Sequence, residues 1–283
     1  PDNLKGIENS SKYQFVQGDI CDQEAVDSAL INCDAIVHFA AESHVDRSIE
    51  NSQDFIKTNV LGTTNLLDAA KKKKIKRFIQ IGTDEVYGSL NQEEQSSVEH
   101  HLLKPNSPYS SSKAAADQIA LSYYQTHDLP VIVTRSSNNY GPYQFPEKLI
   151  PLFITNLLEG KKVPLMGNGE NIRDWIHVED NCRAVLLVLE KGTPGHIYNI
   201  GGENEKTNLS ITKTILTQLN KGESWIQPIP HRLGHDFRYS LNCDKVKLLG
   251  WTQKNTFEEG MKKTIQWYQE NQEWWKKIKE EQK

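Results

Sequence analysis

The chain has few of the residues that hold disulfide-rich or zinc-binding domains together. Its 283 residues include only four cysteines, which lie far apart and form no CxxC pair: Cys21, Cys33, Cys182 and Cys243. Disulfide frameworks and structural zinc sites use closely spaced cysteines. We therefore expect free thiols, no metal site and a reducing compartment such as the cytoplasm.

The sequence also lacks an excess of either charge and any long apolar run. The formal net charge is -4, which gives no reason to expect nucleic-acid or membrane-surface binding. No apolar run approaches the roughly 20 residues of a membrane span. The basic run KKKKIKR at 71–77 is interpreted as solvated lysines at the end of a helix, where the helix dipole favours cations.

Short apolar runs alternate with helical stretches along most of the chain. The runs expected to form strands lie at 13–17, 35–40, 77–83, 131–137 and 196–202. The stretches expected to form helices lie at 23–32, 52–74, 109–126 and 178–192. The continuous apolar character of 35–40 predicts burial on both faces. Strands that alternate with helices predict an α/β fold, a Rossmann-like doubly wound parallel sheet.

The pattern becomes less regular toward the C-terminus. A helix is expected over 146–162, and two more over 207–283. We expect these parts to form a smaller α+β lobe. The predicted larger domain comprises residues 1–145 and 176–206, and the predicted lobe comprises residues 146–175 and 207–283.

A tyrosine and a lysine share one face of the helix expected over 109–126. Tyr109 and Lys113 are four residues apart, hence one turn from each other. A nearby ammonium favours the phenolate, so the spacing predicts a lowered pKa for Tyr109 and a candidate base. An unrelated surface pair would have the same spacing. Thr83 ends the preceding strand, and ligands collect at the carboxyl ends of parallel strands, so Thr83 is expected at the same pocket.

Two adjacent acids, Asp84 and Glu85, follow Thr83 in the stretch IGTDEVYGSL. Carboxylates resist desolvation, so a pair at the end of a buried strand is costly. A polar turn is one explanation. The other is an acid–base pair, because neighbouring carboxylates in a confined site push their pKa values apart.

Eight segments, in chain order, carry a resemblance to a known family. They are FAAESHVDRSIE, TNVLGT, TDEVYGSL, PNSPYSSSKA, RSSNNYGPYQFPEKLIP, RDWIHVED, YNIGG and GHDFRY. These segments resemble the extended short-chain dehydrogenases/reductases and, among them, most closely the dTDP-glucose 4,6-dehydratases. The similarity covers essentially the whole chain. It implies a lyase that uses NAD to convert dTDP-glucose into dTDP-4-keto-6-deoxyglucose and water.

The resemblance also implies roles for the catalytic residues. Tyr109, beside Lys113, would take the proton of the sugar 4-hydroxyl, which Thr83 would hydrogen-bond, while NAD+ takes the C4 hydride. Glu85 would then remove the C5 proton, and Asp84 would protonate the departing 6-hydroxyl. Return of the hydride to C6 would complete the reaction.

The ligand contacts are implied in the same way. The cofactor residues would be Asp19, Ile20, Phe39, Ala40, Ala41, Ser43, Thr58, Tyr109, Lys113 and Asn139. The residues binding the nucleotide sugar would be Ser43, Thr83, Asn138, Lys148, Leu149, Arg173, Asn208, Arg232 and His235. A homodimer is implied, with a four-helix bundle built from helices 52–74 and 109–126.

Some of these residues have a simpler explanation. Arg173 could be a structural ion-pair partner of Asp174 or Asp180, and Arg232 could also be structural. We interpret His44, beside a strand end, as a packed and hydrogen-bonded residue and not as a base.

One part of the family pattern is not found. The family begins with a strand, a glycine-rich GxxGxxG turn and a helix, and the glycines at 167–172 and 200–204 lack that setting. We expect that a preceding segment belongs to the protein; the alternative is a degenerate chain that cannot hold NAD. The rival functions are another nucleotide-sugar epimerase or decarboxylase, and a non-catalytic nucleotide-sugar-binding protein. Asp84 and Glu85 favour the dehydratase, because epimerisation needs no such acid pair.

Overall fold

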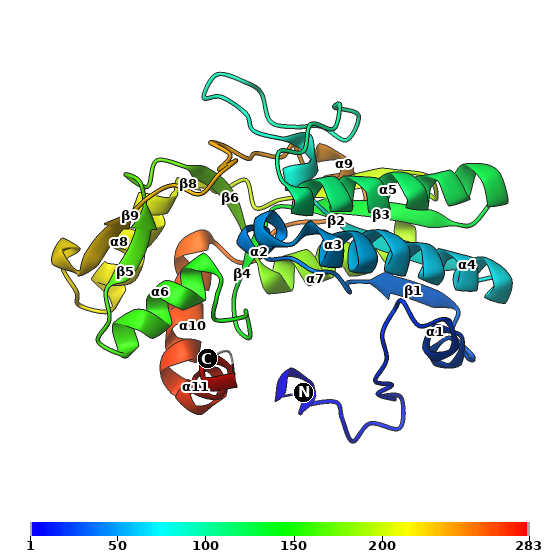
Figure 1. The fold of residues 1–283 in the computed structure, drawn as a ribbon, viewed down its shortest axis with the longest axis horizontal. Coiled ribbons are helices and arrows are strands. Elements are labelled where there is room, and N and C mark those ends of the chain that lie inside the picture. The colour runs from blue at the N-terminus through cyan, green and yellow to red at the C-terminus, as the bar shows by residue number, and fades with distance from the viewer. Residues whose placement is uncertain (1, 282–283) are drawn as a thin grey trace.

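The computed structural model describes residues 2–281 (Figure 1). Its main sheet has four parallel strands in the order β1-β2-β3-β7. The strands are β1 Ala35–His38, β2 Arg77–Thr83, β3 Val131–Ser136 and β7 Ile197–Ile200. Thr83 pairs with Ser136, so the carboxyl ends of β2 and β3 lie level. The expected α/β fold with a parallel sheet is confirmed.

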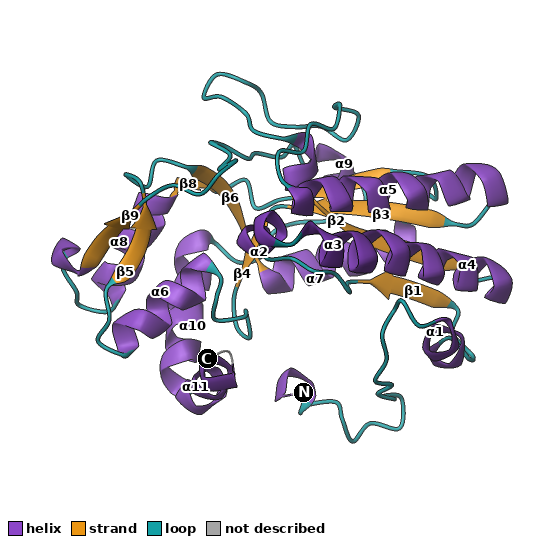
Figure 2. Cartoon of the chain, in the orientation of Figure 1, coloured by secondary structure: helices purple, strands orange, loops and turns teal. Residues whose placement is uncertain are grey.

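Helices cover both faces of this sheet (Figure 2). They are α1 Gln23–Ala29, α4 Thr63–Lys73, α5 Pro108–His127 and α7 Val178–Lys191. Successive strand residues point to opposite faces, so Phe78 packs with Leu67 of α4 while Ile79 packs with Val188 of α7. This double burial explains why β2 and β3 are apolar runs without alternation.

Helix α5 begins at a strong start signal. Ser107 accepts a hydrogen bond from the Ser110 backbone N–H, the Ser110 side chain accepts one in return, and Pro108 occupies the first turn. This start fixes Tyr109 in the first turn, next to the end of β2, and Lys113 one turn further along.

The expected helix over 52–74 is one continuous helical stretch with an unusual centre. Helix α2, Val45–Glu50, precedes it, and α3, Ser52–Phe55, leads into a π-helical segment, Ile56–Gly62, and then α4. A Cβ on Gly62 would lie 2.5 Å from the Ile20 side chain, so glycine lets the preceding loop pack closely there. The four lysines Lys71, Lys72, Lys73 and Lys74 at the end of α4 are exposed, as predicted.

Two expectations about the first strands are wrong. Residues 13–17 form no strand, because no strand in residues 2–281 lies beside them to complete their hydrogen bonds. Strand β1 is therefore the edge of the sheet. Its burial alternates, with Ile36 and His38 buried and Ala35 exposed, so burial on both faces is not found.

Most of the C-terminal elements lie together beside the main sheet (Figure 1), and their buried side chains form a separate cluster. A three-stranded sheet joins β4 Asn138–Tyr140, β6 Ile172–His177 and β8 Glu205–Thr207, and a two-stranded sheet joins β5 Val163–Met166 and β9 Ile226–Ile229. The helices are α6 Leu149–Leu158, α8 Asn208–Gln218, α9 Asp244–Lys247, α10 Phe257–Glu270 and α11 Gln272–Glu281. Ile150, Ile211, Met261 and Trp275 lie in one buried cluster.

The expectation of only two helices over 207–283 is wrong, since α8, α9, α10 and α11 all form. Helix α8 is rich in β-branched threonine and isoleucine, which have weak helix propensity, so packing against α6 decides its structure. Within residues 2–281, no helix has both the length and the apolar character needed to cross a membrane. The four cysteines are free thiols, as expected.

Candidate active site

The acid pair lies where β2 ends and a short 3-10 turn, Asp84–Tyr87, begins. The Thr83 hydroxyl accepts the Glu85 backbone N–H at 3.3 Å and donates to Asp84 Oδ1 at 3.2 Å. Asp84 is buried and Glu85 is half-buried. Thr83 thus caps the turn and holds the two carboxyl groups in fixed directions.

Tyr109 and Lys113 reach the same place from α5. The Tyr109 phenol lies near the Thr83 side chain. Lys113 is buried, and its ammonium donates to the Ile81 carbonyl of β2 at 2.5 Å. The five residues predicted to be catalytic therefore come together at the end of one strand.

The two acids have different electrostatic surroundings. Burial, followed by the charges of Glu85 and Asp174, raises the pKa of Asp84 well above its usual value. Burial also raises the pKa of Glu85, but cations oppose this, first Arg173 and then Arg232. Asp84 therefore favours the protonated form, and Glu85 is the more readily ionised partner.

The predicted lowering of the Tyr109 pKa is wrong for this site. Burial, and then the charge of Glu85, raise the pKa of the Tyr109 phenol well above its usual value. Burial also lowers the pKa of the Lys113 ammonium. Helical spacing predicted the neighbours correctly but could not show how deeply they are buried.

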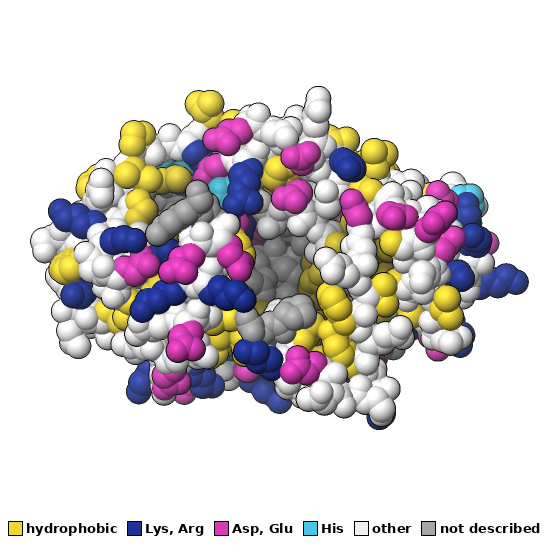
Figure 3. Space-filling model, turned by 60° about the horizontal axis from the view of Figure 1, so that its bottom comes forward, with side chains coloured by type: hydrophobic (Ala, Val, Ile, Leu, Met, Phe, Trp, Pro, Cys, Tyr) yellow, Lys and Arg dark blue, Asp and Glu magenta, His cyan; other side chains and the backbone are white. Residues whose placement is uncertain are grey.

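A cavity of about 370 Å³ opens between the two parts of the molecule. Figure 3 shows the surface hollowed between them. Glu85 lines this cavity, with nearly all of the residues predicted to bind the nucleotide sugar: Ser43, Asn138, Lys148, Leu149, Arg173, Asn208, Arg232 and His235. Thr83 is the exception, since it lies behind Glu85 at the strand end. Three cationic side chains in one cavity suit a diphosphate.

Arg173 is held in place by backbone carbonyls and an aromatic ring. Its guanidinium donates to the Asp236 carbonyl at 2.9 Å and to the Phe237 carbonyl at 3.2 Å, and stacks 4.4 Å from the Tyr239 ring centre. No acid among residues 2–281 forms an ion pair with it, so its charge stays available to a ligand in the cavity.

The structural alternative for Arg173 is therefore not found. Asp174 accepts the backbone N–H groups of Gly202 and Asn204 at 3.0 and 2.7 Å. Asp180 pairs with Arg183 instead.

The other two cations that line the cavity contact neighbouring groups. Lys148 donates to the Ser43 carbonyl at 2.9 Å, and Arg232 lies 3.7 Å from Asp46. Burial, followed by the charge of Arg232, lowers the pKa of His235 to about 3, so this imidazole is neutral.

His44 is packed and hydrogen-bonded, as predicted. It caps α2, where its Nδ1 accepts the Arg47 N–H at 3.4 Å, and its Nε2 lies 3.7 Å from Glu147.

The residues predicted for the cofactor come from several elements. Phe39, Ala40 and Ala41 follow β1 directly, and the Phe39 side chain is 57% exposed. Asp19 and Ile20 lie in the loop that packs on Gly62, and Thr58 lies in the π-helical segment. Asn139, on β4, has a buried side-chain oxygen with no partner in the described chain.

An asparagine links this loop to α5. Asn59, in the π-helical segment, accepts the Glu42 backbone N–H at 2.8 Å and donates to the Glu42 carbonyl at 3.0 Å. It also donates to the Ser112 hydroxyl at 2.8 Å. The loop that follows β1 is thereby tied to the helix that carries Tyr109 and Lys113.

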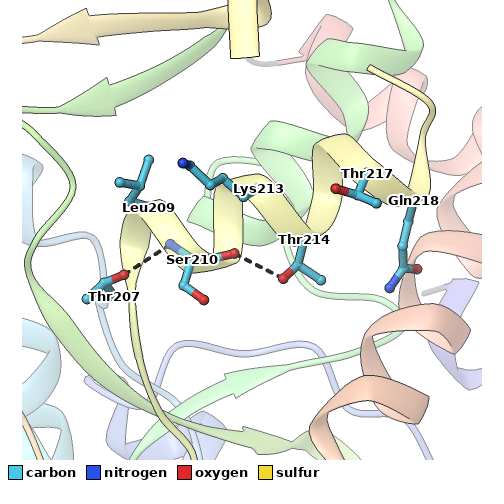
Figure 4. Close-up of a pocket in the computed structure, with 7 residues that line it drawn as sticks. All are labelled: Thr207, Leu209, Ser210, Lys213, Thr214, Thr217 and Gln218. Carbon is cyan, nitrogen blue, oxygen red and sulfur yellow. Dashed lines mark hydrogen bonds between the residues drawn. The ribbon is translucent and has the colours of Figure 1, made fainter. Parts of the chain in front are cut away.

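A second hollow lies on the outer face of α8 (Figure 4). Its lining comes from α8 and the residue before it: Thr207, Leu209, Ser210, Lys213, Thr214, Thr217 and Gln218. None of the predicted site residues lines it, so the cavity between the two parts is the candidate site.

Comparison with known proteins identifies the family. A family model described as GDP-mannose 4,6 dehydratase matches residues 2–264. The dTDP-glucose 4,6-dehydratase of Streptomyces niveus is 49% identical over 278 residues, which cover 98% of this chain and 82% of that protein. The chain belongs to the dTDP-glucose 4,6-dehydratase family.

Solved structures agree with this membership. The dTDP-glucose 4,6-dehydratase of Streptomyces venezuelae, crystallised with NAD and TYD bound, has a TM-score of 0.96 and 46% identity, covering 98% of this chain and 86% of that one. The UDP-glucose 4-epimerase of Thermus thermophilus, in complex with NAD, has a TM-score of 0.87 but 27% identity, covering 95% and 94%. The expected family and enzyme class are confirmed, and an epimerase is disfavoured by the lower identity of the epimerase structure.

Sequence reasoning missed the apolar wall of the cavity. This wall includes Leu152, Phe153, Pro164, Leu165, Met166, Trp175 and Ile229. Leu149, Leu152 and Phe153 have the i, i+3, i+4 spacing of one helix face, which was the available signal. Residues of β5 and β9 meet them only in the folded lobe.

Proposed function

We propose that this chain eliminates water from dTDP-glucose, giving dTDP-4-keto-6-deoxyglucose, with NAD as cofactor. The observation that carries the proposal is the pair Asp84–Glu85 at the end of β2. Burial raises the pKa of both acids. After burial, the charges of Glu85 and Asp174 act most on Asp84, whereas Arg173 and Arg232 act most on Glu85, and the Tyr109 phenol lies near Thr83. An acid, a base and a second proton acceptor are what the chemistry requires.

The residues around β1 fit a nicotinamide cofactor. Ala40 and Ala41 have small side chains that let a nucleotide approach the backbone, and the unpartnered Asn139 oxygen can accept from a carboxamide. Tyr109 and Lys113 border the same space. When bound, NAD+ supplies a hydride acceptor at C4, a hydride donor at C6 and a positive charge that favours the phenolate.

Tyr109 takes the proton of the 4-hydroxyl, and Thr83 orients that hydroxyl. Once C4 is a ketone, the C5 proton is acidic, and Glu85 removes it. The C6–O bond then breaks, and the oxygen leaves as water with the proton from Asp84. Burial favours protonated Asp84, which is the form that can give a proton to the leaving oxygen. Nearby cations oppose protonation of Glu85, and ionised Glu85 is the form that can take the C5 proton.

Arg173, Arg232 and Lys148 bind the diphosphate, and the apolar wall receives the base. We assign the cofactor to residues 1–145 and 176–206, and the nucleotide sugar to residues 146–175 and 207–283. The assignment places the reacting sugar where the two parts meet.

The test is incubation of the full chain with NAD and dTDP-glucose, and separately with UDP-glucose, followed by NMR of the products. We expect a 4-keto-6-deoxy sugar from dTDP-glucose. Formation of the C4 epimer without loss of water would replace the proposal by an epimerase. Tight binding of dTDP with no turnover would replace it by a binding protein.

We also propose that the chain forms a cytoplasmic homodimer through α3, α4 and α5. Ile56 and Leu61, on the π-helical segment, are 47% and 56% exposed, which is unusual for two apolar residues on one helical stretch. Light scattering should give twice the mass that denaturing mass spectrometry gives for one chain, and Leu61→Lys should give the monomer. A monomeric parent protein would refute the dimer, and cell fractionation tests the compartment.

A further inference from the structure

Helix α5 carries a third ionisable residue behind the tyrosine and lysine. Tyr109, Lys113 and Asp117 follow one another at intervals of four residues, so they lie on one face of the helix. Asp117 is completely buried, and Lys113 is 6% exposed. Asp117 does not line the cavity, so direct contact with the nucleotide sugar does not explain its buried charge.

An arginine from the sheet neutralises one side of this carboxylate. Arg135, on β3, is 1% exposed, and its Nε lies 3.0 Å from Asp117 Oδ2. The guanidinium also stacks 4.8 Å from the ring centre of Tyr87. Asp117 Oδ1 has no hydrogen-bond partner among residues 2–281, so the second oxygen is free to act on other charges.

The backbone of β2 makes room for this carboxylate. A Cβ on Gly82 would lie 2.7 Å from the Thr134 carbonyl and 3.0 Å from both carboxylate oxygens of Asp117. Gly82 precedes Thr83 and pairs with Arg135 in the sheet. The ion pair is thus built into the strand end that carries the acids.

Lys113 has few charged neighbours. Tyr109 and Asp117 face it from α5, and the Ile81 carbonyl accepts its proton from β2. His38 faces it from β1, but burial, and then the charge of Lys113, lower the pKa of His38 to about 3, so it is neutral. Burial lowers the pKa of Lys113 and the charge of Asp117 raises it. Asp117 is the charge that opposes desolvation of the lysine.

We propose that Asp117, kept ionised by Arg135, is a positioning residue that holds Lys113 in its ammonium form. The charges alternate from Arg135 through Asp117 to Lys113. The ammonium of Lys113 favours a phenolate at Tyr109, whereas the charge of Asp117 itself raises the pKa of Tyr109, so Asp117 can assist only through Lys113. The inference rests on the proposed role of Tyr109 and Lys113 in catalysis. It explains why a buried ion pair, which is seldom a large source of stability, lies beneath the site.

The charge of Lys113 can be measured without activity. In protein labelled with ¹³C at lysine Cε, the Lys113 signal, assigned from its loss in Lys113→Arg, reports ionisation during a pH titration. Asp117→Asn should move the midpoint to lower pH and raise the fraction of neutral amine about tenfold at a given pH, the effect of a charge several ångströms away. The alkaline limb of kcat/KM for dTDP-glucose should move in the same direction.

Further variants separate charge from folding. Arg135→Gln should act like Asp117→Asn, because the buried carboxyl then takes up a proton, whereas Arg135→Lys should restore the parent titration. The double variant Asp117→Asn/Arg135→Met removes both members of the buried Asp117–Arg135 ion pair, which favours folding, and should keep the lowered midpoint. Glu205→Gln breaks another ion pair, with Arg238, and should leave the Lys113 midpoint unchanged.

The outcomes distinguish this inference from the proposed function. An unchanged Lys113 midpoint in both Asp117→Asn and the double variant would overturn the inference, whatever the activity. A lowered midpoint in a protein that does not convert dTDP-glucose would uphold the ion pair and reject the dehydratase.

Discussion

Replacing Glu85 by glutamine should separate catalysis from binding. The amide keeps the shape of the side chain but cannot take the C5 proton, and a positioned general base contributes about 10²–10⁴-fold to rate. We therefore expect kcat to fall by about that factor. The change also removes a negative charge from a cavity that contains Arg173, Arg232 and Lys148.

The same substitution should strengthen diphosphate binding. The Glu85 carboxylate and a bound diphosphate charge on the order of 10 Å apart, at an effective dielectric constant of about 20, repel each other by about 1.7 kcal/mol. Removing this repulsion should raise the affinity roughly 15-fold, and salt reduces the effect by screening. Turnover and affinity should thus move in opposite directions. A misfolded variant would lose both.

Two measurements test this. Product NMR gives turnover of dTDP-glucose, and isothermal titration calorimetry with dTDP gives affinity, with the exposed Glu190→Gln as a matched control on α7. Near-normal turnover in Glu85→Gln would refute its assignment as the base. Weaker dTDP binding with unchanged thermal stability would refute the electrostatic argument.

Three other outcomes are expected. Asp84→Asn should reduce kcat by about 10²–10⁴-fold. Because the pKa of Asp84 is raised, the activity of the parent protein should decline as the pH rises through this raised pKa. A pH–rate profile without this decline would contradict the role of Asp84 as the acid. Tyr109→Phe should stop the reaction before oxidation, so NMR should recover unchanged dTDP-glucose, and any 4-keto sugar would exclude Tyr109 as the base. The neutral, buried His38 has a folded pKa of about 3 against 6.5, so unfolded chains bind more protons in this interval and stability should fall as pH drops from 6.5 toward 3. His38→Gln should flatten that slope in chemical denaturation, and an unchanged slope would contradict the argument.

Local patterns predicted the elements that carry the chemistry. The apolar run at 77–83 matches β2 at both ends, and the spacing of Tyr109 and Lys113 matches one face of α5. Both predictions depend on patterns within a few residues. The strand is marked by a continuous apolar run that is buried on both faces, and the helix by its capping residues. The cavity residues come from distant parts of the chain and were predicted from the family resemblance. A periodic pattern within one segment cannot show that distant segments lie together.

Properties that depend on surroundings were not predictable. The run at 13–17 has the composition of a strand, but a strand forms only beside a partner. The pKa of Tyr109 depends on burial and on Glu85, which outweigh the lysine that the spacing reveals. The apolar wall of the cavity depends on contacts between α6, β5 and β9.

The π-helical segment at Ile56–Gly62 sets the angular position of Asn59. A π-helical turn contains one residue more than an α-helical turn, so removing a single residue here would restore regular α-helix and rotate Asn59 by about 100° relative to α4. Asn59 would then release both Glu42 and Ser112. The irregular turn therefore fixes the position of the loop after β1 relative to α5. The additional residue lies in neither of them, yet it aligns the two through Asn59.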